Sequence, residues 1–432
     1  MGDGDWGISN LTGLIGIAVL LGIAWLISEN RRRMPWRVIV GGIGLQFVLA
    51  FMLLWFEPVV RLFERIAGWM NRVIASADAG IDFVFGPALG DPGGPAGFVF
   101  AFRALPVIIF FASLMAVLYH WGVMQRLIAV LAWVLRRTLG VTGTEALAMA
   151  ANVFVGQTEA PLCVKPFLER MTRSQLMTIM TGGFATIAGS VLAAYVGILG
   201  ADDASRVAFI KALLTASIMS APAAFVMAKI IVPETDTPVD EGLTDASGPR
   251  QTSNVLDAAA LGATDGLKLA LNVGAMLIAF VSLLALLNWP IEEIGNIGFI
   301  ASWRGEGAEP LSLELMLGTA LAPLAWCMGV ARDDIVLVGS LMGEKVVLTE
   351  FIAYMHLGDA IRDETISPRS AQISAYALCG FANFPSIAIQ IGGLSAIAPG
   401  KRNEFVSLGL RAMIGGALAS WSTACIAGIF IT

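Results

Sequence analysis

The sequence predicts an all-α polytopic membrane protein with eight transmembrane helices plus two re-entrant hairpins in inverted repeats. Its composition gives the first indication, because 57% of the 432 residues are hydrophobic and only 14% are charged. Soluble domains carry about 25% charged residues, and the mean hydropathy here is +0.77. A pattern that occurs twice along the chain gives the second indication. Two interrupted hydrophobic segments give the third.

The repeated pattern joins a Gly-Val pair, one or two acidic residues, a Thr-Glu pair and a Gly-Phe-Ala run in the same order. Its copies occupy 140–141, 145, 158–159 and 183–186, then 329–330, 333–334, 349–350 and 380–383. The Thr-Glu pairs put Glu159 and Glu350 among long apolar segments. A carboxylate near a bilayer centre costs about 2.5–3.5 kcal/mol on insertion scales, so two at matching positions indicate a binding site.

The hydrophobic segments predict the eight spans in order. They cover residues 11–28, 38–56, about 98–119, 176–199, 207–232, 267–287, 374–394 and 405–431. Basic loops stay in the cytoplasm, so the arginines at 31–33 predict a periplasmic N-terminus and, after eight crossings, a periplasmic C-terminus. Residues 57–97 are expected to form an amphipathic surface helix and then a loop. Residues 124–139 are expected to lie on the cytoplasmic face.

The interrupted segments predict the hairpins. Residues 144–168 break around 156–161, and residues 334–357 break around 348–350. Each half has about a dozen residues, which is too short to cross a bilayer. Such a hairpin exposes backbone at its tip, which is tolerated only where the tip lines a cavity. An odd number of crossings separates the two hairpins, so the repeats are expected to be inverted.

Several function classes are disfavoured by the residues themselves. The four Cys and two His are scattered without metal-ligand or disulfide spacing, so neither a zinc site nor a disulfide framework is expected. The arginine run at 31–33 is a topology signal rather than a nucleic-acid site. No nucleophile or metal constellation accompanies Glu159 and Glu350, which argues against an intramembrane enzyme that uses them as an acid/base pair.

Five motifs resemble the concentrative nucleoside transporter family. GQTEAPLCVKPF at 156–167 and TGGFATIAGSVLAAY at 181–195 are similar to its first hairpin and the helix that follows, and NVGAMLIAF at 272–280 matches as well. EKVVLTEFIAY at 344–354 and ALCGFANFPSIAIQIGGL at 377–394 are similar to its second hairpin and broken helix. The resemblance covers about residues 10–430. It implies a bacterial inner (plasma) membrane symporter for nucleosides of the uridine, cytidine and adenosine class.

The resemblance also implies a domain organisation. Each protomer of a lipid-embedded homotrimer would have a scaffold and a transport domain that moves by an elevator-type mechanism. Residues 1–139 would be mostly scaffold, 140–232 the first repeat, 233–253 an acidic cytoplasmic linker, 254–310 a scaffold span with a periplasmic loop, and 311–432 the second repeat. The linker is rich in Pro, Gly and acidic residues, which predicts disorder over 233–250.

The family's substrate site carries over to eight residues. The nucleobase is expected at the first hairpin and the ribose at the second hairpin and later broken helix, with Phe381 against the base. The base contacts would be Gln157, Thr158, Glu159 and Val191, and the ribose contacts Glu350, Asn383 and Ser386. An amide can meet the donor and acceptor edges of a base, and a carboxylate accepts strongly from ribose hydroxyls. The chain departs from the family at Pro385 and Thr349.

The family's sodium site carries over to the side chains of Asn152 and Thr186 and the carbonyls of Val155 and Ile187. Oxygen donors beside unwound backbone suit Na⁺, the expected coupling ion. Two alternatives remain open. Proton coupling would use Glu159 as the carrier. The polar residues would otherwise only hold the structure together, through ion pairs of Glu159 and Glu350 with Lys165 or Lys345 and through interhelical hydrogen bonds of Asn152 and Thr186.

Overall fold

The computed structural model describes residues 8–90, 99–200, 202–240, 252–297 and 310–431, and all regular structure within them is helical. The N-terminal third contains α1 (Ile8–Leu26), α2 (Trp36–Leu54), α3 (Glu57–Gly90), α4 (Phe100–His120) and α5 (Val123–Leu139). The surface helix expected after residue 57 is therefore longer than predicted. Gly86, at φ 72°, interrupts it inside the expected loop, whose remaining residues 91–98 lie outside the described part.

A run of five α-helices then occurs twice in the described residues, although the short 3-10 helices lie at different places in the two runs. The first set contains α6 (Gly143–Asn152), η1 (Ala160–Val164), α7 (Lys165–Leu168), α8 (Arg173–Ala185), α9 (Gly189–Leu199) and α10 (Asp203–Ile231). The second contains η2 (Arg332–Asp334), α14 (Ile335–Val347), α15 (Glu350–Arg362), α16 (Pro368–Leu378), α17 (Phe384–Ile397), η3 (Pro399–Lys401) and α18 (Arg402–Phe430). Gly140 and Gly329, which open the two copies, both adopt positive φ.

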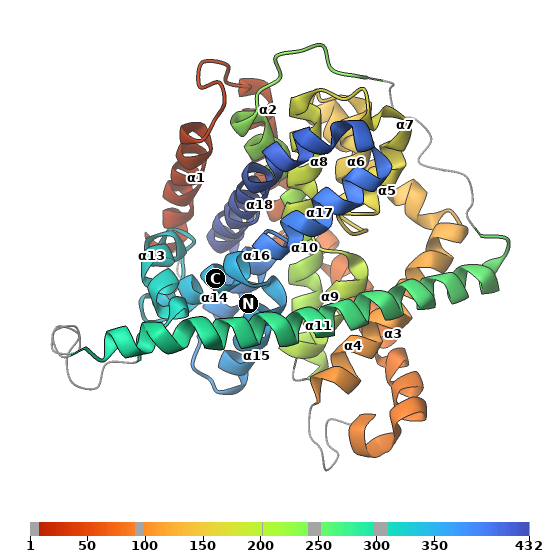
Figure 1. Cartoon of the computed structure of the whole chain (residues 1–432), viewed down its shortest axis with the longest axis vertical. Helices are drawn as coiled ribbons and strands as arrows, with labels where there is room; N and C mark the ends of the chain where they lie inside the picture. Colours follow the sequence, from red (N-terminus) through yellow and green to blue (C-terminus); the bar gives the residue numbers. More distant parts are fainter. Residues whose placement is uncertain (1–7, 91–98, 201, 241–251, 298–309, 432) are drawn as a thin grey trace.

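Between the repeats, α11 (Val255–Gly295) extends well beyond the expected span at 267–287, and α13 (Leu313–Cys327) follows it. With 41 residues, α11 is about 60 Å long. It runs along the outside of the molecule from one side to the other (Figure 1) and packs mainly on α4. Gly262 and Gly266 allow this contact, because a Cβ at either position would meet the α4 backbone.

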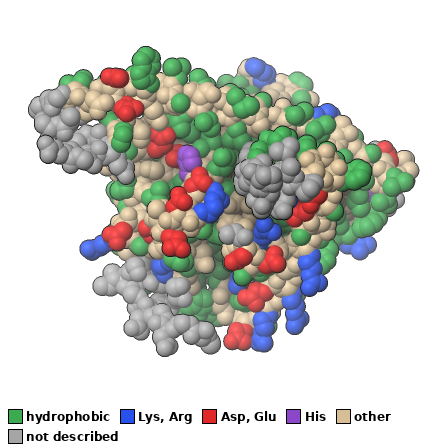
Figure 2. Space-filling view, turned by 90° about the horizontal axis from the view of Figure 1, so that it is seen from below, with side chains coloured by type: hydrophobic (Ala, Val, Ile, Leu, Met, Phe, Trp, Pro, Cys, Tyr) green, Lys and Arg blue, Asp and Glu red, His purple; other side chains and the backbone are tan. Residues whose placement is uncertain are grey.

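Six helical segments among the described residues are long and apolar enough to cross a membrane. They are Trp36–Leu54, Ala101–His120, Arg173–Leu199, Asp203–Ile231, Val255–Gly295 and Pro399–Phe430. Two expected spans are not among them: the apolar described part of the first covers only Leu11–Leu26, and the segment at 374–394 is divided between α16 and α17. Apolar side chains cover much of the face in Figure 2. Leu256, Leu271 and Ile278 of α11 are among the exposed apolar residues of the molecule. The chain is an integral membrane protein.

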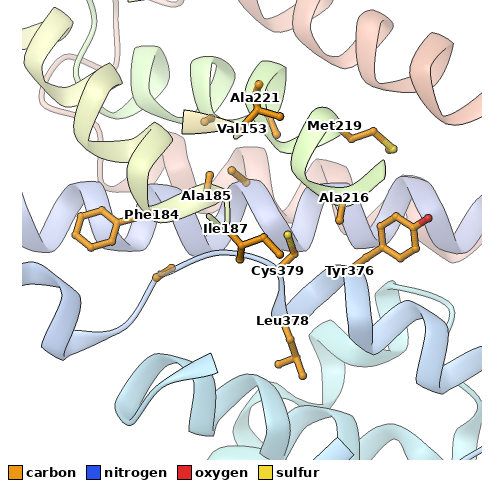
Figure 3. Packing of buried hydrophobic residues seen from close by; sticks show 14 of the residues in the cluster. Val153, Phe184, Ala185, Ile187, Ala216, Met219, Ala221, Tyr376, Leu378 and Cys379 are labelled. Carbon is orange, nitrogen blue, oxygen red and sulfur yellow. The ribbon is translucent and has the colours of Figure 1, made fainter. Parts of the chain in front are cut away.

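The two broken helices meet at their breaks in the buried interior. α8 gives way to α9 at residues 186–188, and α16 gives way to α17 at residues 379–383. Gly380 has φ 114°, and a Cβ there would come within 2.6 Å of the Phe184 carbonyl oxygen. Figure 3 shows Ala185 and Ile187 beside Cys379, with the backbone of the two breaks in direct proximity. Since α10 and α18 flank this crossing, the breaks are shielded by helices that are themselves largely buried.

The expected disordered linker is ordered over its first eight residues, 233–240. Gln175 holds this segment by donating to the Val239 carbonyl (2.8 Å) and accepting from the Val239 amide (3.1 Å). Asp240 accepts from the Gly143 amide at 2.9 Å and pairs with Arg136 at 3.1 Å. The segment thus packs over the N-terminal ends of α6 and α8. The rest of the expected linker, up to residue 251, lies outside the described residues.

The loop between α1 and α2 is fastened to the repeats by one carboxylate. Glu29 accepts from Arg173 at 2.8 Å and from Arg411 at 2.9 Å, which joins the loop to α8 and α18. The hydrogen bond from Arg173 holds the pKa of the Glu29 carboxyl below its ordinary value. The Glu29 amide also donates to the Ile231 carbonyl at the end of α10.

Gly380→Ala is expected to destabilise the protein strongly. The added Cβ would meet backbone oxygen at a positive φ, and neither can be relieved by a side-chain rotation. We expect a loss of several kilocalories per mole, on the order of the largest single-residue effects. Thermal unfolding of the purified protein in detergent measures it. Gly392→Ala is the matched control, because its Cβ would meet nothing within 4 Å. Equal melting temperatures for the two variants would contradict a tight crossing.

Candidate functional site

The first break lies beside the end of α6. The Thr186 hydroxyl is 2.7 Å from the backbone carbonyl oxygen of Asn152 and 3.0 Å from that of Gly182. The Gly189 amide donates to the Phe154 carbonyl at 3.0 Å, so residues 152–155 and 186–189 run side by side. Val155 and Ile187 both lie outside helices within these two segments. The structure therefore brings together the four residues expected at a cation site.

Asn152 makes this place chemically unusual. Its side chain is fully buried, and neither the nitrogen nor the oxygen of the side-chain amide has a hydrogen-bond partner in the described structure. A buried polar group without a partner destabilises a fold by about 1–3 kcal/mol, so an unpaired amide indicates a ligand position. No cluster of three or more His, Cys, Asp or Glu residues occurs among the described residues. The oxygens present suit a hard monovalent cation bound without carboxylates.

The tip of the first hairpin packs against the second broken helix. Gln157 is buried, and its side-chain oxygen has no partner in the described structure. Gly183 of α8 lets the tip and α17 both pack closely on α8, because a Cβ there would collide with Gln157 and with Gln390 of α17. The Thr158 methyl group faces Gly393 in the same way, and Gly156 leaves room for the carboxylate of Glu159. Gln390 donates to the Met180 carbonyl at 3.0 Å, but its own oxygen is also unpaired.

The second hairpin tip places a buried carboxylate between two broken helices. Glu350, 5% exposed, begins α15. Its Oε1 accepts from the Tyr195 hydroxyl of α9, and its Oε2 accepts from the Asn383 amide, each at 2.7 Å. A carboxylate has about four acceptor positions, so two remain after these bonds. Tyr195 is itself fixed by the rings of Phe351 and Tyr354, whose centroids lie 5.2 and 4.4 Å away.

Local capping explains why the expected ribose residues share this place. Asn383 is the N-cap of α17, where its oxygen accepts from the Ser386 amide at 2.8 Å and its nitrogen remains free to reach Glu350. Pro385 stands in the first turn of α17, where a missing N–H has no consequence. Thr349 caps α15 by accepting from Ile352. The two departures from the family pattern therefore serve helix starts.

Two further expected residues, Val191 and Phe381, lie near the breaks and are apolar. Val191 is buried on α9, and Phe381 is half-buried within the second break. Glu350 forms no ion pair with Lys345, whose Nζ instead donates to carbonyls of residues 377 and 379 and to Ser420. No ion pair between Glu159 and Lys165 occurs in the described structure either. The purely structural reading, in which these lysines hold the hairpin carboxylates, is therefore not supported.

The acids at the start of each repeat are structural. Glu145 completes a capping box with Thr142 and pairs with the buried Lys229 at 2.5 Å. Asp334 accepts from the hydroxyl of Ser367, the N-cap of α16, at 2.6 Å. Both carboxylates thus secure helix starts some distance along the chain from the breaks.

Sequence reasoning missed three site residues. Tyr195 and Gln390 belong to apolar runs, so periodicity marks them as packing residues. Lys345 was considered only as a partner of Glu350. The sequence does offer a way to find them, because a tyrosine hydroxyl, an amide and an ammonium group inside apolar membrane segments each require a polar partner.

The comparisons identify relatives for the whole chain. Family models described as "Na+ dependent nucleoside transporter N-terminus", "Nucleoside recognition" and "Na+ dependent nucleoside transporter C-terminus" match residues 15–88, 101–202 and 212–428. An uncharacterized transporter of Haemophilus influenzae is 41% identical over 428 residues, with 98% of each protein covered. Sodium/nucleoside cotransporter 1 of Mus musculus is 39% identical over 97% of this chain and 63% of the mouse protein.

Solved structures agree with the sequence comparisons. CNTnw in an inward-facing substrate-bound state superposes with a TM-score of 0.88, at 40% identity and with 98% of both chains covered. A variant of the same protein in an outward-facing state gives a TM-score of 0.87, again at 40% identity and 98% coverage of both chains. These neighbours are transporters, not enzymes.

Tyr195→Phe is expected to destabilise the protein by about 1–3 kcal/mol, because it leaves one oxygen of a buried carboxylate unpaired. Tyr354→Phe is the matched control. It removes a 2.9 Å bond to the Ala375 backbone carbonyl, a neutral acceptor, and so should have the smaller effect. Thermal unfolding of both variants in detergent measures the difference. A larger loss for the control would show that Tyr195 is not needed to satisfy Glu350.

Proposed function

The chain belongs to the concentrative nucleoside transporter family, and from this premise we propose that it is a sodium-coupled symporter that imports nucleosides across the bacterial inner membrane. The observation that carries the proposal is the buried Glu350 carboxylate, held by Tyr195 and Asn383 from two different broken helices. A group held this way is pre-organised, so little ordering is needed when a ligand binds. Its two remaining acceptor positions suit the hydroxyls of a ribose.

The first hairpin supplies the complementary chemistry for a base. The unpaired side-chain oxygens of Gln157, at the hairpin tip, and of Gln390, on the neighbouring α17, can accept hydrogen bonds. A nucleobase offers N–H donors. Thr158 and Glu159 extend the same tip, and Val191 and Phe381 supply apolar surface near the breaks. We assign the base to this hairpin and the ribose to Glu350, Asn383 and Ser386. Nucleosides of the uridine, cytidine and adenosine class share these features.

Sodium coupling is supported by the geometry around Asn152. The Asn152 and Thr186 side chains and the carbonyls of Val155 and Ile187 would hold the ion, which needs oxygen ligands and no deprotonated group. The unpaired side-chain oxygen of Asn152 would gain a partner when the ion binds. The mouse relative, sodium/nucleoside cotransporter 1, and the family described as Na+ dependent nucleoside transporters support this assignment.

The mechanism we propose is an elevator-type alternation between the two faces of the membrane. The two hairpins would be re-entrant, the repeats inverted and the spans eight, with both termini periplasmic. Residues 140–232 and 311–432 would supply the transport domain, while 1–139 and 254–310 would be mostly scaffold. The exposed apolar side chains of α11 suit contact with lipid and with other protomers of a homotrimer.

Asn152→Ala is expected to raise the sodium concentration needed for half-maximal nucleoside uptake, about tenfold for the loss of one ligand worth 1.4 kcal/mol. Radiolabelled uridine uptake into proteoliposomes, at varied NaCl with choline as the replacement, measures it. Asn71→Ala is the matched control, because this buried asparagine lies on α3 and binds Asp203. Its sodium requirement should stay at the wild-type value.

Uptake that needs no sodium in wild type and variant alike would favour the proton-coupled alternative. In that case a proton gradient should drive uptake, and Glu159→Gln should abolish the response to pH. Persistence of sodium dependence in Glu159→Gln would instead support the sodium assignment.

Glu350→Gln is expected to shrink the preference for uridine over 3′-deoxyuridine. A site built to bond a hydroxyl rejects an analogue that lacks it, because its buried groups are left unpaired. The wild type should bind the deoxy analogue at least tenfold more weakly, and the variant should distinguish the two far less. Competition with labelled uridine uptake measures both affinities. Glu344→Gln, a change at a second buried hairpin carboxylate that bonds His356, should keep the wild-type ratio. Strong competition by uracil against the wild type would contradict the ribose assignment.

A further inference from the structure

Lys345 is a fully buried lysine near the end of α14, at the break of the second broken helix. Its Nζ lies 2.9 Å from the Ala377 carbonyl oxygen, 3.2 Å from that of Cys379 and 2.7 Å from the Ser420 hydroxyl oxygen. The Ser420 hydroxyl donates its own proton to the Ala417 carbonyl, so it meets Lys345 as an acceptor. Three acceptors around one nitrogen require three N–H donors, which only the ammonium form supplies.

No carboxylate balances this charge directly. The oxygens of Glu350 are bonded to Tyr195 and Asn383, and Glu344 bonds His356. The ammonium is instead surrounded by carbonyls at the C-terminal end of α16. The last carbonyls of a helix have no intrahelical partner and carry the negative end of its dipole. Lys345 therefore satisfies backbone oxygens that the break in the helix exposes.

The first repeat has a comparable helix end, although the repeated pattern aligns Ala185 with Ala382, and no hydrogen bond joins a lysine to this end in the described structure. α8 stops at Ala185, with Thr186 as its C-cap, just as α16 stops at Leu378 with Cys379 as its C-cap. The residue that approaches this end from the first hairpin is Asn152, whose buried side chain has no partner. The two ends lie close together, as Ala185, Ile187, Leu378 and Cys379 show in Figure 3. One end is thus filled by an ammonium group, while the other has unpaired polar atoms.

We propose that Lys345 is a tethered cation that occupies, in the second repeat, the position that the exchangeable sodium ion takes in the first. The chain then carries two comparable buried cation sites. The site at Asn152 exchanges its ion with solution, and the other is permanently occupied by the Lys345 side chain. The proposal rests on the proposed sodium site, and it adds a latent second site. Transport should therefore depend on a single sodium ion, because the second position is already charged.

Two substitutions separate a cation site from simple packing. Lys345→Met keeps the length of the side chain but removes its charge and its donors, so the α16 carbonyls lose their partners. Lys345→Asn shortens the side chain and leaves an oxygen-lined space that resembles the Asn152 site. Lys165→Asn is the matched control, because Lys165 lies exposed on the first hairpin. All three proteins are prepared in NaCl and transferred to choline chloride for comparison.

The measurements are uridine uptake against sodium concentration in proteoliposomes and thermal unfolding in NaCl against choline chloride. We expect a Hill coefficient for sodium near one in wild type and Lys165→Asn. Lys345→Met should lose at least tenfold in uptake at any sodium concentration. Lys345→Asn should recover uptake as sodium rises, with a Hill coefficient approaching two. Its melting temperature should rise more with sodium than that of the wild type.

Three results would overturn the tethered cation. They are wild-type uptake by Lys345→Met, a sodium-specific stabilisation of Lys345→Asn no larger than that of the wild type, and failure to recover folded Lys345→Asn from NaCl. The thermal-unfolding measurement does not depend on whether sodium drives nucleoside uptake. If wild-type uptake proves independent of sodium while Lys345→Asn is stabilised by sodium and not by choline, the proposed coupling fails and the tethered cation stands.

Discussion

The crossing of the two helix breaks beside Gly380 is the constraint on which the rest of the structure depends. Each break exposes backbone N–H and C=O groups in an apolar interior, where every such group needs a partner. The close approach of Gly380 to the Phe184 carbonyl leaves no space for water-filled separation of the breaks. Polar side chains must therefore come from the breaks themselves and from the hairpin ends that face them. This requirement explains why Asn152, Thr186, Lys345, Asn383 and Glu350 gather in one small region of an otherwise hydrophobic chain.

Much of this arrangement could be predicted from the sequence because helix breaks leave local signals. The repeated Gly-Phe-Ala runs mark the breaks, and Asn383 followed by Pro385 reads as a helix start. The grouping of Asn383 with Glu350, and of Asn152 with Thr186, is what the resemblance to a known family implies. The resemblance to a known family supplied the roles of these residues. Segment length, charge and turn residues alone predict where the helices break, but not which ligand the residues at the breaks bind.

Other features depended on tertiary contacts that the sequence does not reveal. Tyr195 sits in an apolar run, and only the fold brings its hydroxyl to Glu350. With 41 residues, α11 is longer than a membrane span requires, and its N-terminal end follows the Asn254 cap rather than a change in hydropathy. Residues 233–240 have a composition typical of disorder, but Gln175 and Gly143 offer backbone and side-chain partners that order them. At Tyr195 and at residues 233–240, specific partners overrode composition.

The two repeats differ in how fully their breaks are satisfied, and this difference gives a physical basis for coupling. The second repeat satisfies more of its break within the chain, since Lys345 fills its helix end and Tyr195 and Asn383 hold its carboxylate, but the Gln390 oxygen and two acceptor positions of Glu350 stay available. The first repeat leaves the Asn152 amide and the Gln157 oxygen without partners. A ligand stabilises only the conformations whose unpaired groups it satisfies, so ions and substrates act where the chain is incomplete. Because the 152–155 and 186–189 segments are bonded to each other and the Gln157 tip packs against α17, an ion that orders the first break also orders the wall to which a base would bind. Under the proposed function, binding of the ion at Asn152 would favour binding of the base at Gln157, and by thermodynamic reciprocity the substrate would favour the ion.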